Sequence, residues 1–511
     1  MNLMSITINQ IQKNMIKRLF LSALVLCSAM MASAQVQRPK LVVGLAIDQM
    51  RWDYLYYYYD KYGEGGLKRL VDEGFSCENN HINYVPTVTA IGHSSLYTGS
   101  VPALTGIAGN DFHKDGKRVY CCEDLTVNSV GSSNKAGQMS PRNMLATTIG
   151  DQLKVATDFK SKVIGVALKD RASILPAGHS ADAAYWYDTK AGHFISSTYY
   201  MDKLPEWVEK FNKANHTKPG YDIKPTNEGV TMTFKMAEAA LENEQLGQHD
   251  VTDMLCVSVS STDAVGHKYS TRGKENYEVY MQLDKELAHF LSVLDEKVGR
   301  GNYLLFLSAD HGAAHNPNFL NNHKLPGGGW EAGEAQKALN EALRTQFGVD
   351  MDYVNDVISY QFFINRKGLE EKGLDYEKVK AAAIDFLKKD TQYQYVVDYE
   401  KANTTTIPSR IREQINNGYN RERSGDIVVI LRPDYFEGHI DKDYGGTQHG
   451  VWAPYDTHIP LVFLGWNIKH GSTSQPTHIV DLAATVCAML HIQMPTACIG
   501  DAILPVVEMG K

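Results

Sequence analysis

Short apolar stretches recur along the chain between segments with helical spacing. They are rich in β-branched residues, and their apolar side chains occupy consecutive rather than alternate positions. Consecutive apolar positions are typical of strands buried on both faces, as in a parallel sheet covered by helices. The pattern therefore predicts an α/β fold with a largely parallel central sheet flanked by helices. The expected strands are 40–48, 162–168, 253–260, 303–310, 426–431 and 459–465, and the expected helices are 51–73, 231–244, 274–297, 376–389 and 479–490.

The length of 511 residues exceeds that of a typical single domain, but no repeat, low-complexity linker or clear boundary divides the sequence. We therefore expect one catalytic domain over 35–511 that is enlarged by inserted cap segments near 172–228 and 316–425. Both segments are rich in Tyr, Asn, Lys and Gly, and they are poor in the acidic and histidine pairs that cluster elsewhere.

Residues 1–34 have the features of a secretory signal peptide. Lys13, Lys17 and Arg18 precede an apolar run over 19–31, and the small residues Ala-Ser-Ala at 32–34 match a signal peptidase site. The sequence thus predicts an exported protein, periplasmic or extracellular. The apolar run is too short to span a bilayer well, and no later segment is longer, so we expect no stable membrane insertion.

The cysteines change this picture little. Cys27 would be the lipid attachment site of a lipoprotein, but Leu26 before it is bulkier than that processing usually accepts. Six cysteines remain after residue 34, and outside the cytosol some of them could form disulfides. No C-x-x-C repeat marks a metal site, and the sequence leaves the pairing open.

The charge balance excludes one class of partner. The formal net charge is -8, and loss of a leader with three positive and no negative charges takes it to -11. An acidic protein repels polyanions, so nucleic acid is not an expected partner. A small phosphate compound remains a possible ligand because a local metal ion can attract it.

Acidic residues and histidines follow several of the expected strands. Ligands of open parallel sheets bind beyond the carboxyl ends of the strands, so these side chains should converge on one edge. Carboxylate oxygen and imidazole nitrogen suit a borderline divalent ion, with zinc as the first choice and manganese or cobalt as alternatives. The residues are Asp48, Asp263, His267, Asp310 and His311, with His449 in a glycine-rich loop before the last strand.

Each of these signals is weak alone. An aspartate at a strand end is as often a turn former or helix cap as a ligand. Asp263 and His267 are four residues apart and could simply pair on one helix face. The joint pattern is stronger, because bridging ligands could hold two metal ions ~4 Å apart for an in-line phosphoryl displacement.

The stretch VPTVTAIGHSS at 85–95 contains two candidate nucleophiles, Thr87 and Thr89, before a run of small residues that could begin a helix. A helix N-terminus offers backbone N–H groups and a positive dipole to an incoming phosphate. Either threonine could equally be an ordinary helix cap.

The ordered motifs D48, PTVTAIGH, TDAVGH, ADHG and GTQHG together resemble the alkaline phosphatase superfamily. Within it, the sequence is similar to the phosphate-irrepressible alkaline phosphatases and to the nucleotide pyrophosphatase/phosphodiesterases. The resemblance covers most of the chain after residue 34. It implies that the second threonine, Thr89, is the nucleophile, that Thr87 is a structural neighbour, and that Asn110 donates to a phosphoryl oxygen.

The same resemblance implies two zinc ions. One would be held by Asp263, His267 and His449. The other would be held by Asp48, Asp310 and His311, with the Thr89 oxygen. His93, four residues after the nucleophile, is expected beneath its helix or against a carboxylate that supports a ligand.

Lys169 and Arg171 in VALKDRAS resemble the Lys-x-Arg pair that monoesterases direct at phosphoryl oxygens and that the diesterases lack. A monoester carries one more negative charge than a diester, so two cations favour it in the transition state. The alternative is a solvated turn.

These features predict an exported, zinc-dependent alkaline phosphatase that hydrolyses small phosphate monoesters through a phosphothreonine intermediate. The nearest alternative is a phosphodiesterase or nucleotide pyrophosphatase of the same fold. A non-catalytic binding protein on this scaffold is the alternative from another class, and the presence of every ligand position argues against it.

Overall fold

The computed structural model describes residues 15–17 and 36–510, and the chain divides into two units after Arg38. The predicted signal peptide lies outside the described residues except for a helical turn at 15–17. In the part of the chain that is described, no helix is both long and apolar enough to cross a membrane. The unit that begins at Pro39 contains the sheets and the candidate site.

A ten-stranded sheet forms the centre of this unit, in the order β19-β2-β18-β11-β1-β10-β7-β8-β9-β6. Five adjacent strands in its middle are parallel, from β11 to β8. They are β11 (Tyr303–Ser308), β1 (Leu41–Ile47), β10 (Asp253–Val259), β7 (Val163–Ala167) and β8 (Ala183–Asp188), and every residue in them is buried. The fold class predicted from the apolar stretches is confirmed.

Antiparallel strands complete both sides of the sheet. On one side β18 (Leu461–Gly465) pairs with β11, followed by β2 (Phe75–Cys77) and β19 (Gly471–Thr473). On the other side β9 (His193–Ser197) and β6 (Ser129–Val130) follow β8. The strand expected at 459–465 therefore lies within the central sheet, but it runs antiparallel to the five parallel strands.

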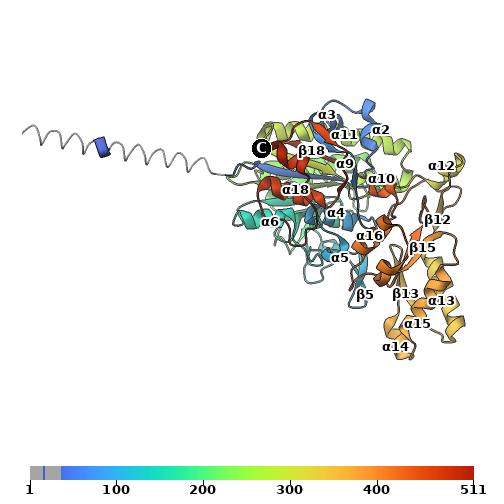
Figure 1. Ribbon diagram of the computed structural model, residues 1–511. Coiled ribbons are helices and arrows are strands. Elements are labelled where there is room, and N and C mark those ends of the chain that lie inside the picture. The colour runs from blue at the N-terminus through green and yellow to red at the C-terminus, as the bar shows by residue number, and fades with distance from the viewer. Residues whose placement is uncertain (1–14, 18–35, 511) are drawn as a thin grey trace, which may run out of the picture. The chain divides into compact units, whose positions relative to one another are not determined.

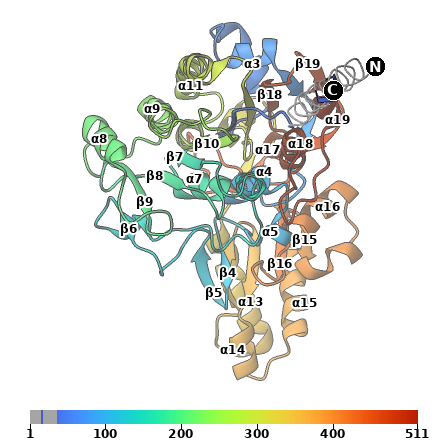
Figure 2. The same cartoon turned by 90° about the vertical axis from the view of Figure 1, so that its left-hand side faces the viewer.

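Helices cover both faces of the sheet. One face packs against α4, α6, α7 and α18, and the other against α3, α9 and α11, as Figure 2 shows for α7 and α9. Their bounds are α3 (Leu67–Glu73), α4 (Thr89–Thr98), α6 (Ile149–Ala156), α7 (Asp170–Ala177), α9 (Asn227–Asn243), α11 (Lys274–Leu294) and α18 (Asp481–Leu490).

The single helix predicted over 51–73 is wrong. This segment forms the short helix α2 (Tyr54–Tyr57), a 3-10 turn at Tyr59–Lys61 and then α3. Gly63, Gly65 and Gly66 lie in the interruption, where the Asp284 carboxylate accepts backbone N–H bonds from Gly63 and Leu67. Glycine destabilises a helix interior, and the loop gains these tertiary bonds instead.

A second, four-stranded antiparallel sheet has the order β13-β14-β16-β15 and packs against α13 and α15. Figure 1 shows it in orange, with both helices beside it. Its bounds are β13 (Val354–Ile358), β14 (Gln361–Ile364), β15 (Tyr393–Asp398), β16 (Ile427–Leu431), α13 (Ala332–Phe347) and α15 (Tyr376–Leu387).

The strand predicted at 426–431 belongs to this second sheet, which corrects its expected place in the central sheet. Ile427, Val429 and Leu431 of β16 pack in one hydrophobic core, whereas Val428 and Ile430 pack in another. The strand is thus buried on both faces without being parallel. A continuous apolar run reports burial of both faces and not strand direction.

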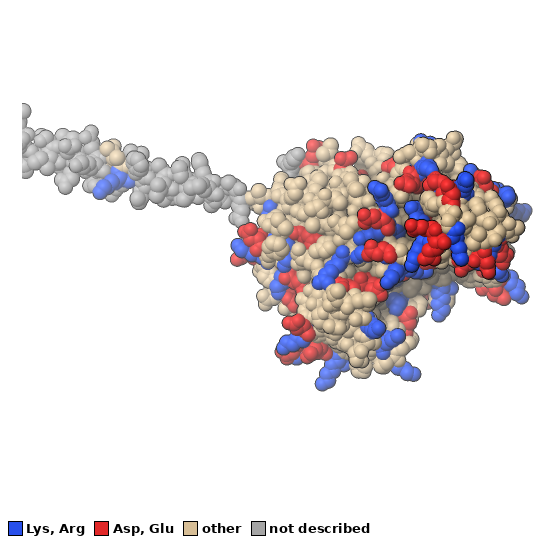
Figure 3. Space-filling view, turned by 90° about the horizontal axis from the view of Figure 1, so that it is seen from below, with Lys and Arg blue, Asp and Glu red and all other residues tan. Residues whose placement is uncertain are grey.

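The two segments expected as insertions contribute differently to the sheets. Residues 172–228 contain β8 and β9 of the central sheet, and residues 316–425 contain three strands of the second sheet. Their status as insertions stays a prediction. On the face drawn in Figure 3, cationic and acidic side chains are interspersed.

Candidate active site

The carboxyl ends of β11, β1 and β10 bring the predicted acidic residues together. Asp48 follows β1 directly, Asp310 follows β11, and Asp263 lies in α10 (Ser261–Tyr269), which begins just after β10. Because the three strands are parallel and adjacent, their ends meet at one edge of the sheet. We call the six side chains gathered there the rim cluster; they are Asp48, Asp263, His267, Asp310, His311 and His449.

Asp263, His267 and His449 form one group with the geometry of a metal site. Asp263 Oδ1 lies 3.1 Å from His267 Nε2 and 3.7 Å from His449 Nε2. His267 Nδ1 is 3.1 Å from the carbonyl oxygen of Thr447, and His449 Nδ1 is 2.7 Å from that of Thr87. If each Nδ1 donates its proton to that carbonyl, each Nε2 keeps a free lone pair.

Asp48, Asp310 and His311 form the other half of the cluster, and all three are fully buried. His311 Nε2 lies 3.6 Å from Asp48 Oδ1 and 3.4 Å from Asp310 Oδ2. Asp48 Oδ1 and His311 Nε2 have no hydrogen-bond partner among the described residues, and Asp310 Oδ2 has only a 3.2 Å contact with His93 Nδ1. Asp263 also lies close enough to share a metal ion with Asp48 and His311, so it can bridge both groups.

The two predicted cations have different surroundings from those expected. Lys169 Nζ lies 2.6 Å from Asp48 Oδ2 and 2.6 Å from Asp263 Oδ2 and therefore bridges the two halves of the rim cluster. Arg171 Nη1 donates to Tyr120 Oη at 3.1 Å, and the Tyr120 hydroxyl donates to Asp170. Lys169 thus contacts the rim cluster itself, and Arg171 contacts Tyr120. Both cations were expected to face phosphoryl oxygens, and both have protein partners instead.

Electrostatics show that the cluster has an excess of negative charge. Burial, together with the carboxylates of Asp263 and Asp310, raises the pKa of Asp48 well above its usual range. Burial also opposes ionisation of Asp263, but His267 and Lys169 outweigh it and hold its pKa well below the usual range. A bound dication would stabilise all three carboxylates in ionised form.

The two histidines of the first group have pKa values that are shifted in opposite directions. Burial and the neighbouring His311 ring lower the pKa of His449 well below its usual value, so His449 is neutral and its lone pair is available. Burial also acts to lower the pKa of His267, but the Asp263 carboxylate outweighs it and raises that pKa. A metal ion on His267 would replace this proton.

Thr89 is the first residue of α4, and its side chain is 1% exposed. Asn110 lies at the same helix end, where its Oδ1 accepts a 2.9 Å hydrogen bond from Ala90 N. This bond fixes the amide and leaves its Nδ2 free to donate. Thr89 Oγ1 has no hydrogen-bond partner among the described residues.

Thr87 has structural contacts. Its hydroxyl lies 3.0 Å from the carbonyl oxygen of Val451 and 3.1 Å from Asp456 Oδ2, and it accepts a bond from Gly450 N. These bonds connect the segment before α4 to the loop that carries His449. The expected assignment of Thr87 as a structural neighbour agrees with these contacts.

Two supporting residues complete the site, and only one was expected. His93 Nδ1 lies 2.9 Å from the Thr89 carbonyl oxygen, within the helix as expected, and 3.2 Å from Asp310 Oδ2, which is a predicted metal ligand rather than a carboxylate that supports one. Gln49 was missed: its Nε2 donates to Asp263 Oδ1 at 2.6 Å, and its backbone N donates to Asp310 Oδ1 at 3.1 Å.

Gln49 reaches both carboxylates because of its backbone conformation. Its φ is 65°, which is the left-handed region that only glycine adopts without cost. A Cβ on Gly266 would lie 1.9 Å from Gln49 Oε1, so that glycine gives the side chain its space. The only signal for Gln49 in the sequence was its position next to Asp48.

These observations fit a divalent metal centre on chemical grounds. Buried oxygen and nitrogen atoms without hydrogen-bond partners converge, two histidines present Nε2 to a shared carboxylate, and the ligand types suit zinc. Thr89 at the helix N-terminus adds a hydroxyl beside this centre.

Known proteins resemble the chain over most of its length. A family model described as type I phosphodiesterase / nucleotide pyrophosphatase matches residues 42–452. A Myroides odoratus protein named calcium-transporting ATPase is 47% identical over 533 residues, covering 94% of this chain and 97% of the relative. Alkaline phosphatase PafA of Elizabethkingia meningoseptica is 45% identical over 524 residues, covering 92% of this chain and 95% of the relative.

Solved structures agree with this similarity. The crystal structure of wild-type alkaline phosphatase PafA has a TM-score of 0.89 at 44% identity and covers 93% of this chain and 100% of that one. A variant of the same phosphatase was solved with substitutions at a threonine, an asparagine 21 residues later, a lysine and an arginine two residues after it. Thr89 and Asn110 have the first spacing, and Lys169 and Arg171 have the second.

Proposed function

The chain belongs to the type I phosphodiesterase / nucleotide pyrophosphatase family within the alkaline phosphatase superfamily, and from this membership we propose an exported, zinc-dependent alkaline phosphatase. Its substrates are small phosphate monoesters, and Thr89 is the nucleophile that forms a phosphothreonine intermediate. The observation that carries the proposal is the contact of the rim cluster with the start of α4, where Thr89 begins the helix: His449 bonds the Thr87 carbonyl oxygen, and His93 contacts both the Thr89 carbonyl oxygen and Asp310.

The proposed metal ligands follow the two halves of the rim cluster. Asp263, His267 and His449 would hold one zinc ion, and Asp48, Asp310 and His311 the other, with the Thr89 hydroxyl. Zinc would supply Lewis acidity that favours the ionised hydroxyl and stabilises the leaving oxygen. Among these six residues, Asp310 has the weakest geometric support, since neither group of converging ligand atoms includes it.

The chain's own residues would bind and orient the phosphoryl group. The N–H groups in the first turn of α4 would face an anion bound at its N-terminus, except that of Ala90, which donates to Asn110 Oδ1. Asn110 Nδ2 is available to donate because Ala90 N holds the amide by its oxygen. Lys169 and Arg171 would supply positive charge to the remaining oxygens, and this favours a monoester dianion over a diester.

A phosphodiesterase is the second candidate, and one observation favours it. Lys169 contacts Asp48 and Asp263, and Arg171 contacts Tyr120, so both cations have protein partners. If these contacts persist with metal bound, neither cation selects for a monoester. The non-catalytic alternative is weaker, because every expected ligand is present and the relatives include named alkaline phosphatases.

The deciding measurement is the ratio of kcat/KM for an aryl phosphate monoester to that for its methyl diester, on zinc-loaded protein at mildly alkaline pH. The proposal predicts a ratio far above unity that collapses in the Lys169→Ala/Arg171→Ala variant. A ratio below unity would identify a diesterase. Export is tested separately by N-terminal sequencing of the secreted protein, which should begin at Gln35.

A further inference from the structure

A cavity of about 440 Å³ adjoins the rim cluster beyond the carboxyl ends of β7 and β8. It is lined by 168–171 after β7 and by 186–190 at the end of β8, together with Tyr120 and residues of neighbouring loops. Strands β10, β7 and β8 are consecutive and parallel. The cavity therefore lies at the same edge of the sheet as Asp263, at the ends of the next two strands, β7 and β8.

The cavity is cationic in a protein that is acidic as a whole. Three lysines that the proposed chemistry does not use lie around it, Lys135, Lys190 and Lys224, in addition to Lys169 and Arg171. The acidic residues in its lining are Asp170 and Asp188. The full chain has a formal net charge of -8, so this local excess of positive charge runs against the overall balance.

Two of these three lysines, Lys135 and Lys190, are not neutralised, whereas Lys224 has an acidic partner. Although burial opposes this, hydrogen bonds from Ser132 and Asn134 lower the pKa of Asp188, but among the described residues Asp188 forms no ion pair with any of the three. Lys135 and Lys190 are exposed, and neither ammonium group has an ion pair among the described residues. Lys224 Nζ lies 3.0 Å from Thr189 Oγ1, and it also contacts Asp222 at 2.9 Å.

Aromatic side chains lie among these cations. Trp186 and Tyr187 are buried at the end of β8, and the Trp186 indole donates a 3.0 Å hydrogen bond to the Ala136 carbonyl oxygen. That bond holds the ring next to the loop that carries Lys135. Because Trp186 is 2% exposed and Tyr187 5% exposed, the two rings make the cavity wall rigid and offer little surface of their own to a ligand.

We propose that this cavity receives the alcohol or phenol part of the substrate and favours monoesters whose leaving group carries a second anion, such as a carboxylate. This inference rests on the proposed function, which places the phosphoryl group at the rim cluster beside Lys169. Adjacent strands are ~4.8 Å apart, so a substrate extending from β10 past β7 reaches the β8 loop within two strand spacings. Lys135, Lys190 and Lys224 are binding residues in this model of recognition, outside the reacting groups.

The experiment compares two substrates on zinc-loaded protein at low ionic strength, 4-carboxyphenyl phosphate and the neutral 4-carbamoylphenyl phosphate. The variant is Lys135→Gln/Lys190→Gln/Lys224→Gln, which keeps polar, flexible side chains and removes three charges. Each exposed ion pair contributes little, but loss of three charges together should lower kcat/KM for the carboxylate substrate about tenfold. The amide substrate should change less than twofold.

Lys388→Gln is the matched control, because Lys388 is exposed beyond α15 and has no ion pair among the described residues. It should leave both substrates unaffected. An equal loss on both substrates in the triple variant would overturn the inference, since it would show general attraction of the phosphate dianion. No loss on either substrate would overturn it as well.

A binding measurement separates this inference from the proposed function. Calorimetry with 4-carboxybenzylphosphonate and its 4-carbamoyl analogue gives affinities that need no turnover. If the wild-type protein hydrolyses neither ester but the triple variant still loses affinity for the carboxylate compound alone, the phosphatase assignment fails and the anion subsite stands. Equal affinities of wild type and triple variant for the carboxylate compound would refute the subsite.

Discussion

Two groups of stacked histidines lie in this protein, and their surroundings give them different chemistry. In the rim cluster, the rings of His311 and His449 stack at 3.5 Å and 11°. In the second group, His81 stacks on His458 at 4.5 Å and 24°, and His458 stacks on Trp52. We call these last three residues the histidine stack. The ring arrangement alone does not distinguish the two groups.

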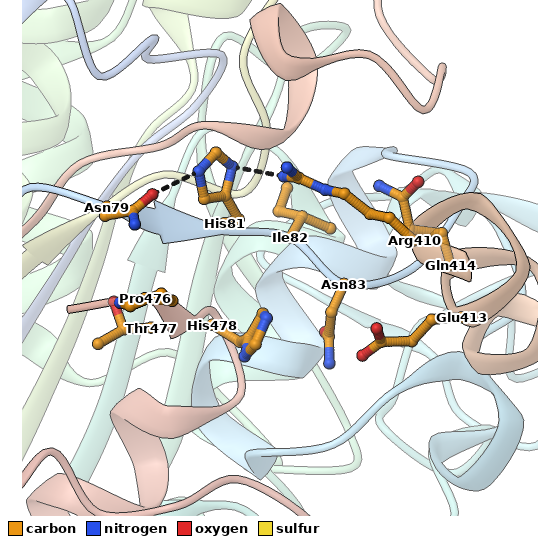
Figure 4. A pocket seen from close by; sticks show the side chains of 10 residues that line it. All are labelled: Asn79, His81, Ile82, Asn83, Arg410, Glu413, Gln414, Pro476, Thr477 and His478. Atoms are coloured by element: carbon orange, nitrogen blue, oxygen red, sulfur yellow. Dashed lines mark hydrogen bonds between the residues drawn. The ribbon is translucent and has the colours of Figure 1, made fainter. Parts of the chain in front are cut away.

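The hydrogen-bond partners do distinguish them. Both ring nitrogens of His81 are occupied, because Arg410 Nη2 lies 2.9 Å from Nδ1 and Asn79 Oδ1 lies 2.9 Å from Nε2 (Figure 4). In the rim cluster, by contrast, Nδ1 of each histidine faces a backbone carbonyl and Nε2 faces carboxylate oxygens. A histidine group is therefore a metal-site candidate when carboxylates face its remaining nitrogens, whatever the number of rings.

The largest expected effect tests the reacting group beside the rim cluster. Thr89→Ala should lower kcat/KM for an aryl phosphate by at least about a thousandfold, because the nucleophilic hydroxyl is lost. Because three protein ligands of the zinc ion beside Thr89 remain, the metal content of this variant at saturating zinc should stay that of the wild type. His81→Ala in the histidine stack should retain activity within about threefold, after correction for the folded fraction.

Thr89→Ser supplies the matched control, since it keeps a hydroxyl at the start of α4 and should retain measurable turnover. Full activity of Thr89→Ala would remove Thr89 from the mechanism, whatever the metal content.

The next effect separates the two histidine groups by metal binding. His449→Ala should weaken zinc binding by more than the 10- to 100-fold that loss of a supporting residue costs, because a ligand itself is removed. His458→Ala should leave the zinc stoichiometry of wild type. Both are measured by elemental analysis after dialysis against a series of buffered zinc concentrations. Equal stoichiometry in both variants and wild type would contradict the distinction between the two groups.

Much of the rim cluster was predictable because strand ends are visible in sequence. Asp48 and Asp310 follow apolar runs that form adjacent parallel strands, so their convergence follows from topology. The contact of Lys169 with Asp48 and Asp263 was not predictable, because it depends on side-chain reach across neighbouring strands. Strand β16 shows the same limit at the level of the fold, since its apolar run fixes burial but not which sheet it joins.

Gln49 is a further difference between the two histidine groups. It bonds two carboxylates of the rim cluster, and no glutamine does so among the described contacts of the histidine stack. Gln49→Ala removes the 2.6 Å bond to Asp263 and should weaken zinc binding about 10- to 100-fold. Gln49→Gly removes the same bond but accepts the positive φ, so it should be about 1 kcal/mol more stable than the alanine variant. Zinc affinity by competition with a chelating dye and stability by urea unfolding check the two effects. Wild-type affinity in both variants would leave Gln49 with a purely local role.

The smallest effect concerns the histidine stack and the pH dependence of folding. Burial, then His458 and Arg410, lower the pKa of His81 to about 3. The unfolded chain binds a proton at His81 below about pH 6.5, whereas the folded stack excludes that proton until about pH 3. Stability from neutral His81 is thus fully present above pH 6.5 and is lost as the pH falls toward 3.

His81→Gln should therefore reduce the loss of stability on acidification. A fully buried group would contribute about 1.4 kcal/mol per pH unit, and the half-buried His81 should contribute less than about 1 kcal/mol. Urea unfolding of metal-free wild type and variant at pH 7.5 and 5.5 measures the difference, and the exposed His470→Gln is the control. If wild type and His81→Gln lose equal stability between the two pH values, the stack does not exclude the proton. Its histidines would then be as open to a cation as those of the rim cluster, and the contrast between the two groups would rest on the carboxylates alone.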